Sequence, residues 1–268
     1  MLISPTTYQG GKHRIAGQIL DVINPQGEDF YDLCCGSGNI SIELINRGYD
    51  PTKIHMLDCG PWGLFWKLVG EGRFDLHKFQ QICKDIPAEA TEIQGYIKEL
   101  SKQPADIDTP YVYLLLQAAS FGGKSIWIKD NKWQNCSFRS YWTPTATSNR
   151  RSHVNPMMPM PPTLLQRATA ICEKMTGVHG YYQNIEDFQP GKGIVYIDPP
   201  YSNLTAYGNT FDVLTYAQKF NCYVSEAQPL TSKFVVVSEG RKKGGISGER
   251  TSIAAEILNI FDGIQNLA

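Results

Sequence analysis

The chain has 268 residues, of which 42% are apolar and 19% are charged, and its formal net charge is −1. This composition is typical of a globular protein and excludes a largely disordered chain. The near-neutral charge also excludes a uniformly basic nucleic-acid-binding protein, so any surface for DNA is expected to be a local basic patch.

No apolar run approaches the length of a membrane-spanning helix, and the first residues lack the pattern of a secretory signal. The seven cysteines include one close pair, Cys34-Cys35, and none has the spacing of a zinc site. We therefore expect a cytoplasmic enzyme with reduced thiols, no metal and no membrane partner.

The first part of the chain predicts a repeating α/β unit. Ile15, Ile19 and Ile23 lie four residues apart, which indicates an amphipathic helix. The elements predicted here are a helix over 12–23, a buried strand over 29–35, a helix over 39–47 with Gly48 as its C-cap, and a strand over 53–58. Together they indicate the start of a doubly wound sheet.

The middle of the chain predicts helices followed by a loop-rich segment. Helical patterns cover 74–86 and 110–120, and another helix is expected over 163–175. The segment 121–162 is rich in Trp, Asn, Thr, Met and Pro without periodicity. This favours loops and short strands on a surface rather than in a core.

The last part of the chain returns to an α/β pattern. The expected elements are strands over 177–182 and 193–198, a helix over 212–220, a strand over 234–238, and a final strand within 253–261 where a short helix is the alternative. The predicted fold is thus one Rossmann-like α/β sheet with an insertion. A catalytic and cofactor-binding domain would span 1–60 and 177–268, with a helical and loop-rich insertion over 61–176.

The tetrapeptide Asp198-Pro199-Pro200-Tyr201 directly follows a predicted strand, where open α/β sheets place their ligands. An aromatic amino nitrogen is a poor nucleophile because its lone pair is delocalised. The Asp198 carboxylate and the Pro199 carbonyl are suited to accept hydrogen bonds from its two N–H groups and so expose that lone pair. Pro200 contributes no N–H, and Tyr201 is suited to stack on a base. The pattern predicts methylation of an amino group on a flipped-out base.

Two glycine motifs favour a nucleotide-like cofactor. The turn 32–38, DLCCGSG, connects a strand to a helix, and Asp58 ends the next strand, where a carboxylate is suited to ribose hydroxyls. Ser41 replaces the third glycine of GxGxxG, which disfavours a nicotinamide enzyme. The segment 8–12, YQGGK, precedes the first helix and is suited to hold a carboxylate.

YQGGK, FYDLCCGSG and YIDPPY, in this order, resemble the Dam-like DNA adenine N6-methyltransferases. The resemblance covers about 8–58 and 180–262, and it implies S-adenosylmethionine as cofactor, double-stranded DNA as substrate and a target-recognition insertion. Leu33-Cys34 stands where the family usually has Pro-Phe. We also expect a stand-alone enzyme that works as a monomer, although a restriction–modification role stays open.

The resemblance further implies roles for individual residues. The implied cofactor-binding residues are Tyr8, Gly10, Gly11, Lys12, Asp32, Gly36, Ser37, Gly38, Asp58, Asp187 and Phe188. The implied catalytic residues are Asp198, Pro199, Pro200 and Tyr201. Tyr207 and Phe211 match the family's aromatic spacing and are candidates for the base pocket, with core packing the alternative for Phe211.

The segment 121–151 carries six Lys or Arg residues, one acid and three tryptophans. Basic and aromatic residues in this mixture suit phosphate contacts, base readout and wedging into a base stack. The residues expected to contact DNA are Lys124, Lys132, Arg139, Asn149, Arg150 and Arg151. A second basic stretch, Arg241-Lys242-Lys243 with Arg250, is either a phosphate contact or a solvated loop.

Two alternatives remain at this stage. N4-cytosine methylation uses the same nitrogen chemistry, although such enzymes more often have Ser where Asp198 stands. A DNA-binding protein that keeps the fold without activity is the second. The intact DPPY motif disfavours it, because such a protein has no need for Asp198.

Overall fold

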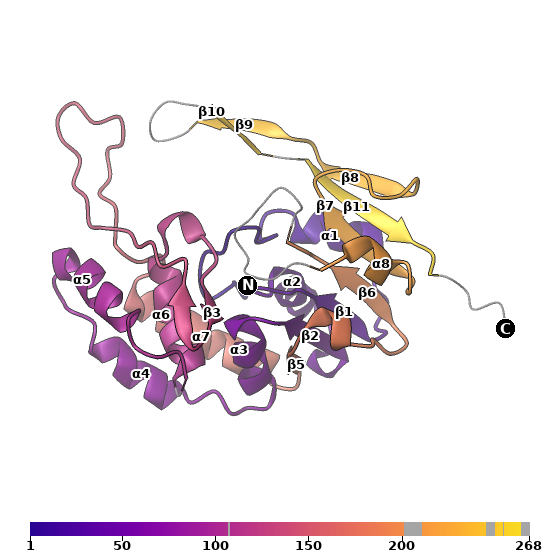
Figure 1. Ribbon diagram of the computed structural model, residues 1–268, viewed down its shortest axis with the longest axis horizontal. Helices are drawn as coiled ribbons and strands as arrows, with labels where there is room; N and C mark the ends of the chain where they lie inside the picture. Colours follow the sequence, from indigo (N-terminus) through magenta and orange to yellow (C-terminus); the bar gives the residue numbers. More distant parts are fainter. Residues whose placement is uncertain (107, 201–210, 245–249, 254, 264–268) are drawn as a thin grey trace.

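The structure is a computed structural model that describes residues 1–106, 108–200, 211–244, 250–253 and 255–263. Its centre is a seven-stranded sheet in the order β5-β2-β1-β6-β7-β11-β8 (Figure 1). The strands are β1 (Phe30–Leu33), β2 (Ile54–Asp58), β5 (His179–Tyr182), β6 (Ile194–Ile197), β7 (Cys222–Glu226), β8 (Phe234–Ser238) and β11 (Glu256–Phe261). This mixed α/β architecture agrees with the predicted Rossmann-like sheet.

Five strands of this sheet, β5, β2, β1, β6 and β7, are parallel, whereas β11 runs antiparallel between β7 and β8. Numbered by position in the chain, the order is 3-2-1-4-5-7-6. The first five positions match a doubly wound nucleotide-binding sheet, which continues with strand 6 in dinucleotide enzymes. The reversed strand inserted before the last one distinguishes this chain from that order.

Side chains on alternate positions of the strands pack on opposite faces of the sheet. Phe30 and Ile54 belong to the larger buried cluster, which includes residues of the helices on one face. Tyr31 and Leu33 belong to the smaller cluster on the other face. The helices are α1 (Ala16–Ile23), α2 (Asn39–Asn46), α3 (Pro61–Gly70), α4 (Leu76–Lys84), α5 (Ala90–Leu100), α6 (Thr109–Ala119), α7 (Pro161–Met175) and α8 (Val213–Ala217).

Short elements complete the fold. They are the 3-10 helices η1 (Pro51–Lys53), η2 (Phe121–Gly123) and η3 (Ile185–Asp187), and the hairpins β3 (Trp127–Lys129) with β4 (Lys132–Gln134) and β9 (Arg241–Gly244) with β10 (Arg250–Ile253). Within the segment 253–261, residues 256–261 form strand β11, in agreement with the strand preferred from the sequence, while Ile253 ends β10. Strand β7 was not expected.

The helix predicted from residue 12 begins at Ala16, because Lys12 to Ile15 form a turn. Gly48 lies beyond Arg47, the C-cap of α2.

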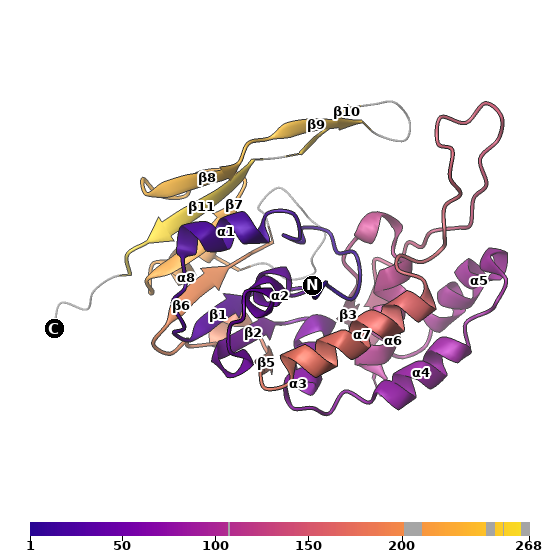
Figure 2. The same cartoon turned by 180° about the vertical axis from the view of Figure 1, so that it is seen from behind.

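The segment 61–176 shares its core with the sheet. Residues of α3 to α7 belong to the same buried cluster as those of α1 and α2. Within it, Tyr113 stacks on Trp133 at 6.3 Å between ring centroids and meets Trp62 edge-on at 5.2 Å. Figure 2 shows α3, α6 and α7 close to the sheet end that contains β5.

The expectation that 121–162 lies on a surface was wrong for several residues, including four large apolar ones. Ile126, Trp133, Phe138 and Met157 are buried. Trp133 is drawn inward because β4 pairs with β3 and presents its ring to Tyr113. Among the described residues, no helix is long and apolar enough to cross a membrane.

Helix α3 approaches β5 so closely that glycine is required between them. A Cβ built on Gly180 would lie 2.2 Å from the Lys67 nitrogen and 2.3 Å from the Trp66 carbonyl carbon, both backbone atoms. In contrast, a Cβ on Gly95 in the middle of α5 would meet nothing within 4 Å. The two glycines form a matched pair for testing this packing.

We expect Gly180→Ala to lower the free energy of unfolding by about 1–3 kcal/mol, because backbone atoms cannot give way. Gly95→Ala should raise it by about 0.5–1 kcal/mol, because Ala favours a helix more than Gly does. Urea unfolding followed by circular dichroism measures both. Equal stability of the Gly180→Ala variant and the wild type would contradict the packing described for α3 on β5.

Candidate active site

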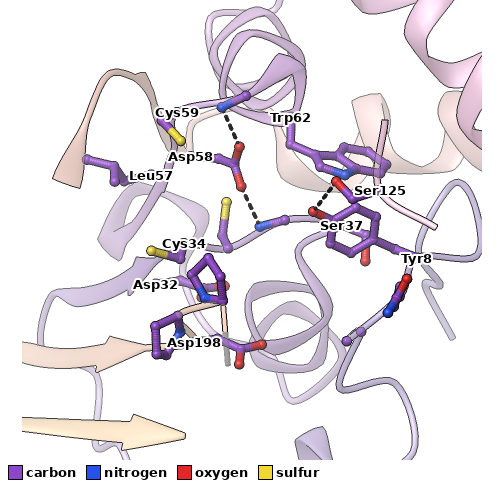
Figure 3. Close-up of a pocket in the computed structure, with 18 of the residues that line it drawn as sticks. Tyr8, Asp32, Cys34, Ser37, Leu57, Asp58, Cys59, Trp62, Ser125 and Asp198 are labelled. Carbon is purple, nitrogen blue, oxygen red and sulfur yellow. Dashed lines mark hydrogen bonds between the residues drawn. The ribbon is translucent and has the colours of Figure 1, made fainter. Parts of the chain in front are cut away.

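A pocket lies at the carboxyl ends of β1, β2 and β6 (Figure 3). It sits where the strand order reverses, because β1 has β2 as its neighbour on one side and β6 as its neighbour on the other. Residues from three loops that follow these strands line it, together with the segment 8–12, residues 125–127 of the insertion and residues 184–185 after β5. Ligands bind at this kind of switch point in open α/β sheets.

Asp32, in β1, is 1% exposed and caps the N-terminus of α2. Its Oδ2 accepts hydrogen bonds from the Ser41 hydroxyl at 2.6 Å and the Ser41 backbone N–H at 3.3 Å. Burial raises the pKa of Asp32 to about 7, against the hydrogen bonds from Ser41, which lower it. The positive end of α2 is therefore already occupied by a carboxyl group of the protein itself.

Asp58, at the end of β2, organises the two neighbouring loops. Its Oδ2 accepts from the Gly36 N–H at 3.1 Å, and its Oδ1 accepts from the Gly60 N–H at 2.7 Å. Burial raises the pKa of Asp58 to about 6. Each carboxylate oxygen has a second lone pair, so the group retains acceptor capacity toward the pocket.

Tyr8 closes one side of the pocket. A Cβ on Gly36 would lie 2.8 Å from the Tyr8 ring, so the ring rests directly on the loop after β1. The Tyr8 hydroxyl lies 3.2 Å from the Ser125 Oγ, and its ring meets Trp62 edge-on at 5.9 Å. The N-terminal segment and the insertion thus meet across the pocket.

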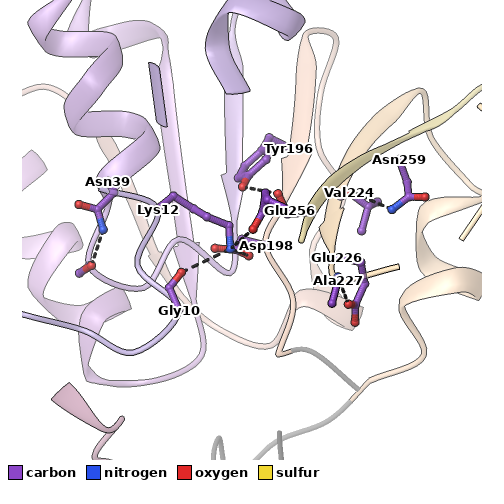
Figure 4. Close-up of polar contacts among 12 residues, drawn as sticks. Gly10, Lys12, Asn39, Tyr196, Asp198, Val224, Glu226, Ala227, Glu256 and Asn259 are labelled. Carbon is purple, nitrogen blue, oxygen red and sulfur yellow. Dashed lines mark hydrogen bonds and ion pairs between the residues drawn. The ribbon is translucent and has the colours of Figure 1, made fainter. Parts of the chain in front are cut away.

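Asp198 follows β6, and its N–H donates to the Leu33 carbonyl at 3.1 Å, which extends the pairing of β6 with β1. The Nζ of Lys12 lies 2.7 Å from its Oδ1 (Figure 4). Burial raises the pKa of Asp198 to about 6, while the Lys12 charge lowers it and that of Glu256 raises it. The Asp198 side chain is 19% exposed and lines the pocket.

Most of the expected cofactor and catalytic residues meet in this pocket. Those that line it are Tyr8, Gly10, Gly11, Lys12, Asp32, Gly36, Ser37, Asp58, Asp198, Pro199, Pro200 and Phe211. Gly38 instead packs behind the loop, where a Cβ would lie 2.5 Å from Trp66. Tyr201 and Tyr207 lie outside the described residues.

The segment after β5 contributes other residues than expected. Asn184 and Ile185 line the pocket, whereas Asp187 is exposed and Phe188 packs in the smaller core against Tyr181 at 4.9 Å. Phe211 lines the pocket and also meets Tyr216 edge-on at 6.0 Å, so it packs against the smaller core as well.

Sequence reasoning missed two buried acids, Glu226 at the end of β7 and Glu256 at the start of β11. Glu256 lies 3.6 Å from the Lys12 Nζ. A charged residue within the apolar run 253–261 was the available signal, because Glu is rarely buried without a partner. Among the described residues, no cluster of His, Cys, Asp and Glu is suited to hold a metal ion.

The residues expected to bind DNA are spread over the insertion. Lys124 is exposed next to the pocket-lining residues 125–127, and Lys132 is exposed in β4. Arg139 is partly buried, and its burial lowers the pKa of its guanidinium. Asn149, Arg150 and Arg151 are exposed in the long loop before α7. Of the three tryptophans, Trp133 is core, Trp127 lines the pocket and Trp142 is exposed.

No protein-family model and no curated protein matches this chain. Its function has to be argued from the pocket itself.

Asp32→Asn tests the burial of this carboxyl group, because Asn keeps an acceptor oxygen for Ser41. The folded-state pKa of about 7 lies above the ordinary value, so the folded protein binds this proton more tightly than the unfolded one. The contribution to stability is therefore present at low pH and is lost as pH rises toward 7.

We expect the difference in unfolding free energy to shift in favour of the variant by about 1–3 kcal/mol between about pH 4 and pH 7.5. Urea unfolding at several pH values measures it. Parallel pH dependence of the two proteins would show that Asp32 titrates as an ordinary carboxyl group.

Proposed function

We propose that this chain transfers a methyl group from S-adenosylmethionine to an exocyclic amino nitrogen of a DNA base, with N6 of adenine as the expected acceptor. The observation that carries the proposal is the position of Asp198. Its carboxylate lines the same pocket as Asp58 and Asp32, so an acceptor for an amino group lies beside two acids suited to a cationic, ribose-containing cofactor.

The N-terminus of α2 favours a cofactor without phosphates. In dinucleotide enzymes this end of the helix binds a pyrophosphate. Here the Asp32 side chain accepts a hydrogen bond from the Ser41 N–H, so a phosphate bound at this end of the helix would lie against a carboxyl group. The amino-acid end of S-adenosylmethionine carries an ammonium group, for which Asp32 is a suitable partner.

The rest of the pocket suits the other parts of such a cofactor. Asp58 has acceptor capacity for ribose hydroxyls, and Leu57, Ile185 and Pro61 offer apolar surface beside it for an adenine ring. Gly10 and Gly11 allow close approach of a ligand at the opposite side. When bound, the cofactor supplies a methyl group on a positively charged sulfur.

Asp198 and Pro199 perform the chemistry on the acceptor in this proposal. The carboxylate and the Pro199 carbonyl each accept a hydrogen bond from one N–H of the amino group, which makes the nitrogen lone pair available. The nitrogen then gains the methyl group and loses a proton, for which Asp198 is the acceptor. A pKa of about 6 leaves Asp198 mostly ionised at neutral pH and makes it more basic than an exposed Asp.

The arrangement around the pocket supports DNA as the substrate class. Residues 140–155 form a long excursion that is closed at its base by paired hydrogen bonds between Trp142 and Val154. The hairpin β9–β10 extends from the other end of the sheet, and both reach beyond the body of the molecule at the same side (Figures 1 and 2). The hairpin segment 241–253 contains four Lys or Arg residues, and the excursion contains the pair Arg150-Arg151. A base in a duplex must leave the stack to reach Asp198.

Asp198→Asn tests the proposal, because Asn keeps the size of the side chain but cannot take up the proton. We expect methyl transfer to unmethylated duplex DNA to fall by about 100-fold or more. Affinity for S-adenosylmethionine should stay within about threefold, since Asp58 and Asp32 remain. Methyl-labelled cofactor followed by digestion of the DNA to nucleosides measures both the rate and the methylated base.

Asp21→Asn is the matched control, since Asp21 is an exposed acid paired with Arg47, remote from the pocket lining. It should transfer methyl groups at the wild-type rate. Label in N4-methylcytosine would keep the chemistry and change the acceptor base. A wild-type protein that binds the cofactor and transfers nothing to DNA would refute the proposal and favour a non-catalytic DNA-binding protein.

A further inference from the structure

The base of the pocket contains an ion-pair cluster whose members come from distant parts of the chain. The Lys12 side chain is 6% exposed, and its Nζ lies 2.7 Å from Asp198 Oδ1 and 3.6 Å from Glu256 Oε2 (Figure 4). The same ammonium donates to the Gly10 carbonyl at 3.3 Å. Lys12 thus stands between two carboxylates, of which only Asp198 has a role in the proposed reaction.

The Lys12 charge opposes the role of Asp198 as a proton acceptor. The ammonium lies at Oδ1, so Oδ2 and the second lone pair of Oδ1 can still accept hydrogen bonds from an amino group. However, the adjacent positive charge lowers the pKa of Asp198. A buried ammonium is costly without a partner, so proton uptake by Asp198 is favoured by a second buried acceptor for Lys12.

Glu256 is placed for this purpose by an irregularity in the sheet. Strand β11 pairs with β8 through Glu256 opposite Ser238 and Ile257 opposite Val236, so the register skips Val237. Such a bulge re-aims the side chains beside it. Glu256 is 7% exposed, and its Oε2 is directed to the Lys12 ammonium.

We propose that Glu256 is a positioning residue for methyl transfer, which takes over the Lys12 ammonium when the target amino group binds to Asp198. The inference rests on the proposed function. Lys12 keeps its three protons and shifts from the nearer carboxylate to the farther one. Asp198 then loses the adjacent positive charge and becomes a stronger acceptor for the proton that the amino group releases.

Several charged and titratable groups face Asp198 and affect its proton affinity. They are Lys12 before α1, Glu256 in β11, Glu226 in β7, Asp32 in β1 and Tyr196 in β6. Lys12 lowers the pKa of Asp198, whereas Glu256 and Glu226 raise it. Removal of the Glu256 charge removes an effect that raises the pKa of Asp198 and leaves the Lys12 charge that lowers it, so the pKa of Asp198 falls.

Glu256→Gln is the variant that tests this role. We expect kcat for methyl transfer to fall by about 10-fold or more, with the affinity for S-adenosylmethionine within about threefold of wild type. The acidic limb of the profile of kcat/KM against pH should move to lower pH, a change that a merely structural role would not produce. Glu256→Asp keeps the charge and should keep the limb near its wild-type position.

A double-mutant cycle with Lys12→Met shows whether Glu256 acts through Lys12. We expect Glu256→Gln to cause no further loss of kcat when Lys12 is already Met, since no ammonium then lowers the proton affinity of Asp198. Equal losses in both backgrounds, or full activity of Glu256→Gln in a protein whose wild type is active, would overturn the inference alone. A wild type that methylates no DNA would remove the proposed function and the inference with it.

Discussion

One buried carboxyl group, Asp32, and two partly buried ones, Asp58 and Asp198, determine how the loops at the carboxyl edge of the sheet are folded. Asp32 accepts from Ser41 at the start of α2, Asp58 joins the loops at Gly36 and Gly60, and Asp198 holds Lys12. Burial raises the pKa of each, so each favours its protonated form more than an exposed acid does. A buried carboxyl group is tolerated only with such partners, so the loops cannot rearrange independently of them.

The same constraint connects structure to the proposed chemistry. An anion in a water-poor pocket interacts more strongly with a cationic or proton-donating ligand than it does in water. A sulfonium cofactor with an ammonium group and a base with an amino group are ligands of this kind. Binding of such ligands therefore offsets part of the free energy that burial of the acids costs the folded protein. A phosphate at Asp32 would instead add a second negative charge beside a carboxyl group.

Local patterns in the sequence predicted much of the fold and of the pocket. Strands β1, β2 and β6 are short apolar runs, and the motifs that contain Asp32 and Asp198 lie at the ends of β1 and β6. The strands of the sheet and the position of the pocket at their carboxyl ends could therefore be predicted from residues close together in the sequence. Trp133 and Glu256 were not anticipated as core and site residues. Trp133 is buried through its stacking on Tyr113 of α6, and Glu256 lies beside a bulge between β11 and β8. Both contacts join segments that are separated in the chain.

A crystal structure with S-adenosylhomocysteine, the product that the proposed reaction leaves in the pocket, tests the central claim most directly. The account predicts that the ribose hydroxyls bind the Asp58 carboxylate and that the ammonium group of the amino-acid end lies at Asp32, with the Asp198 carboxylate open to the remaining space. Failure of the compound to bind at millimolar concentration, or binding away from Asp58, would contradict the account.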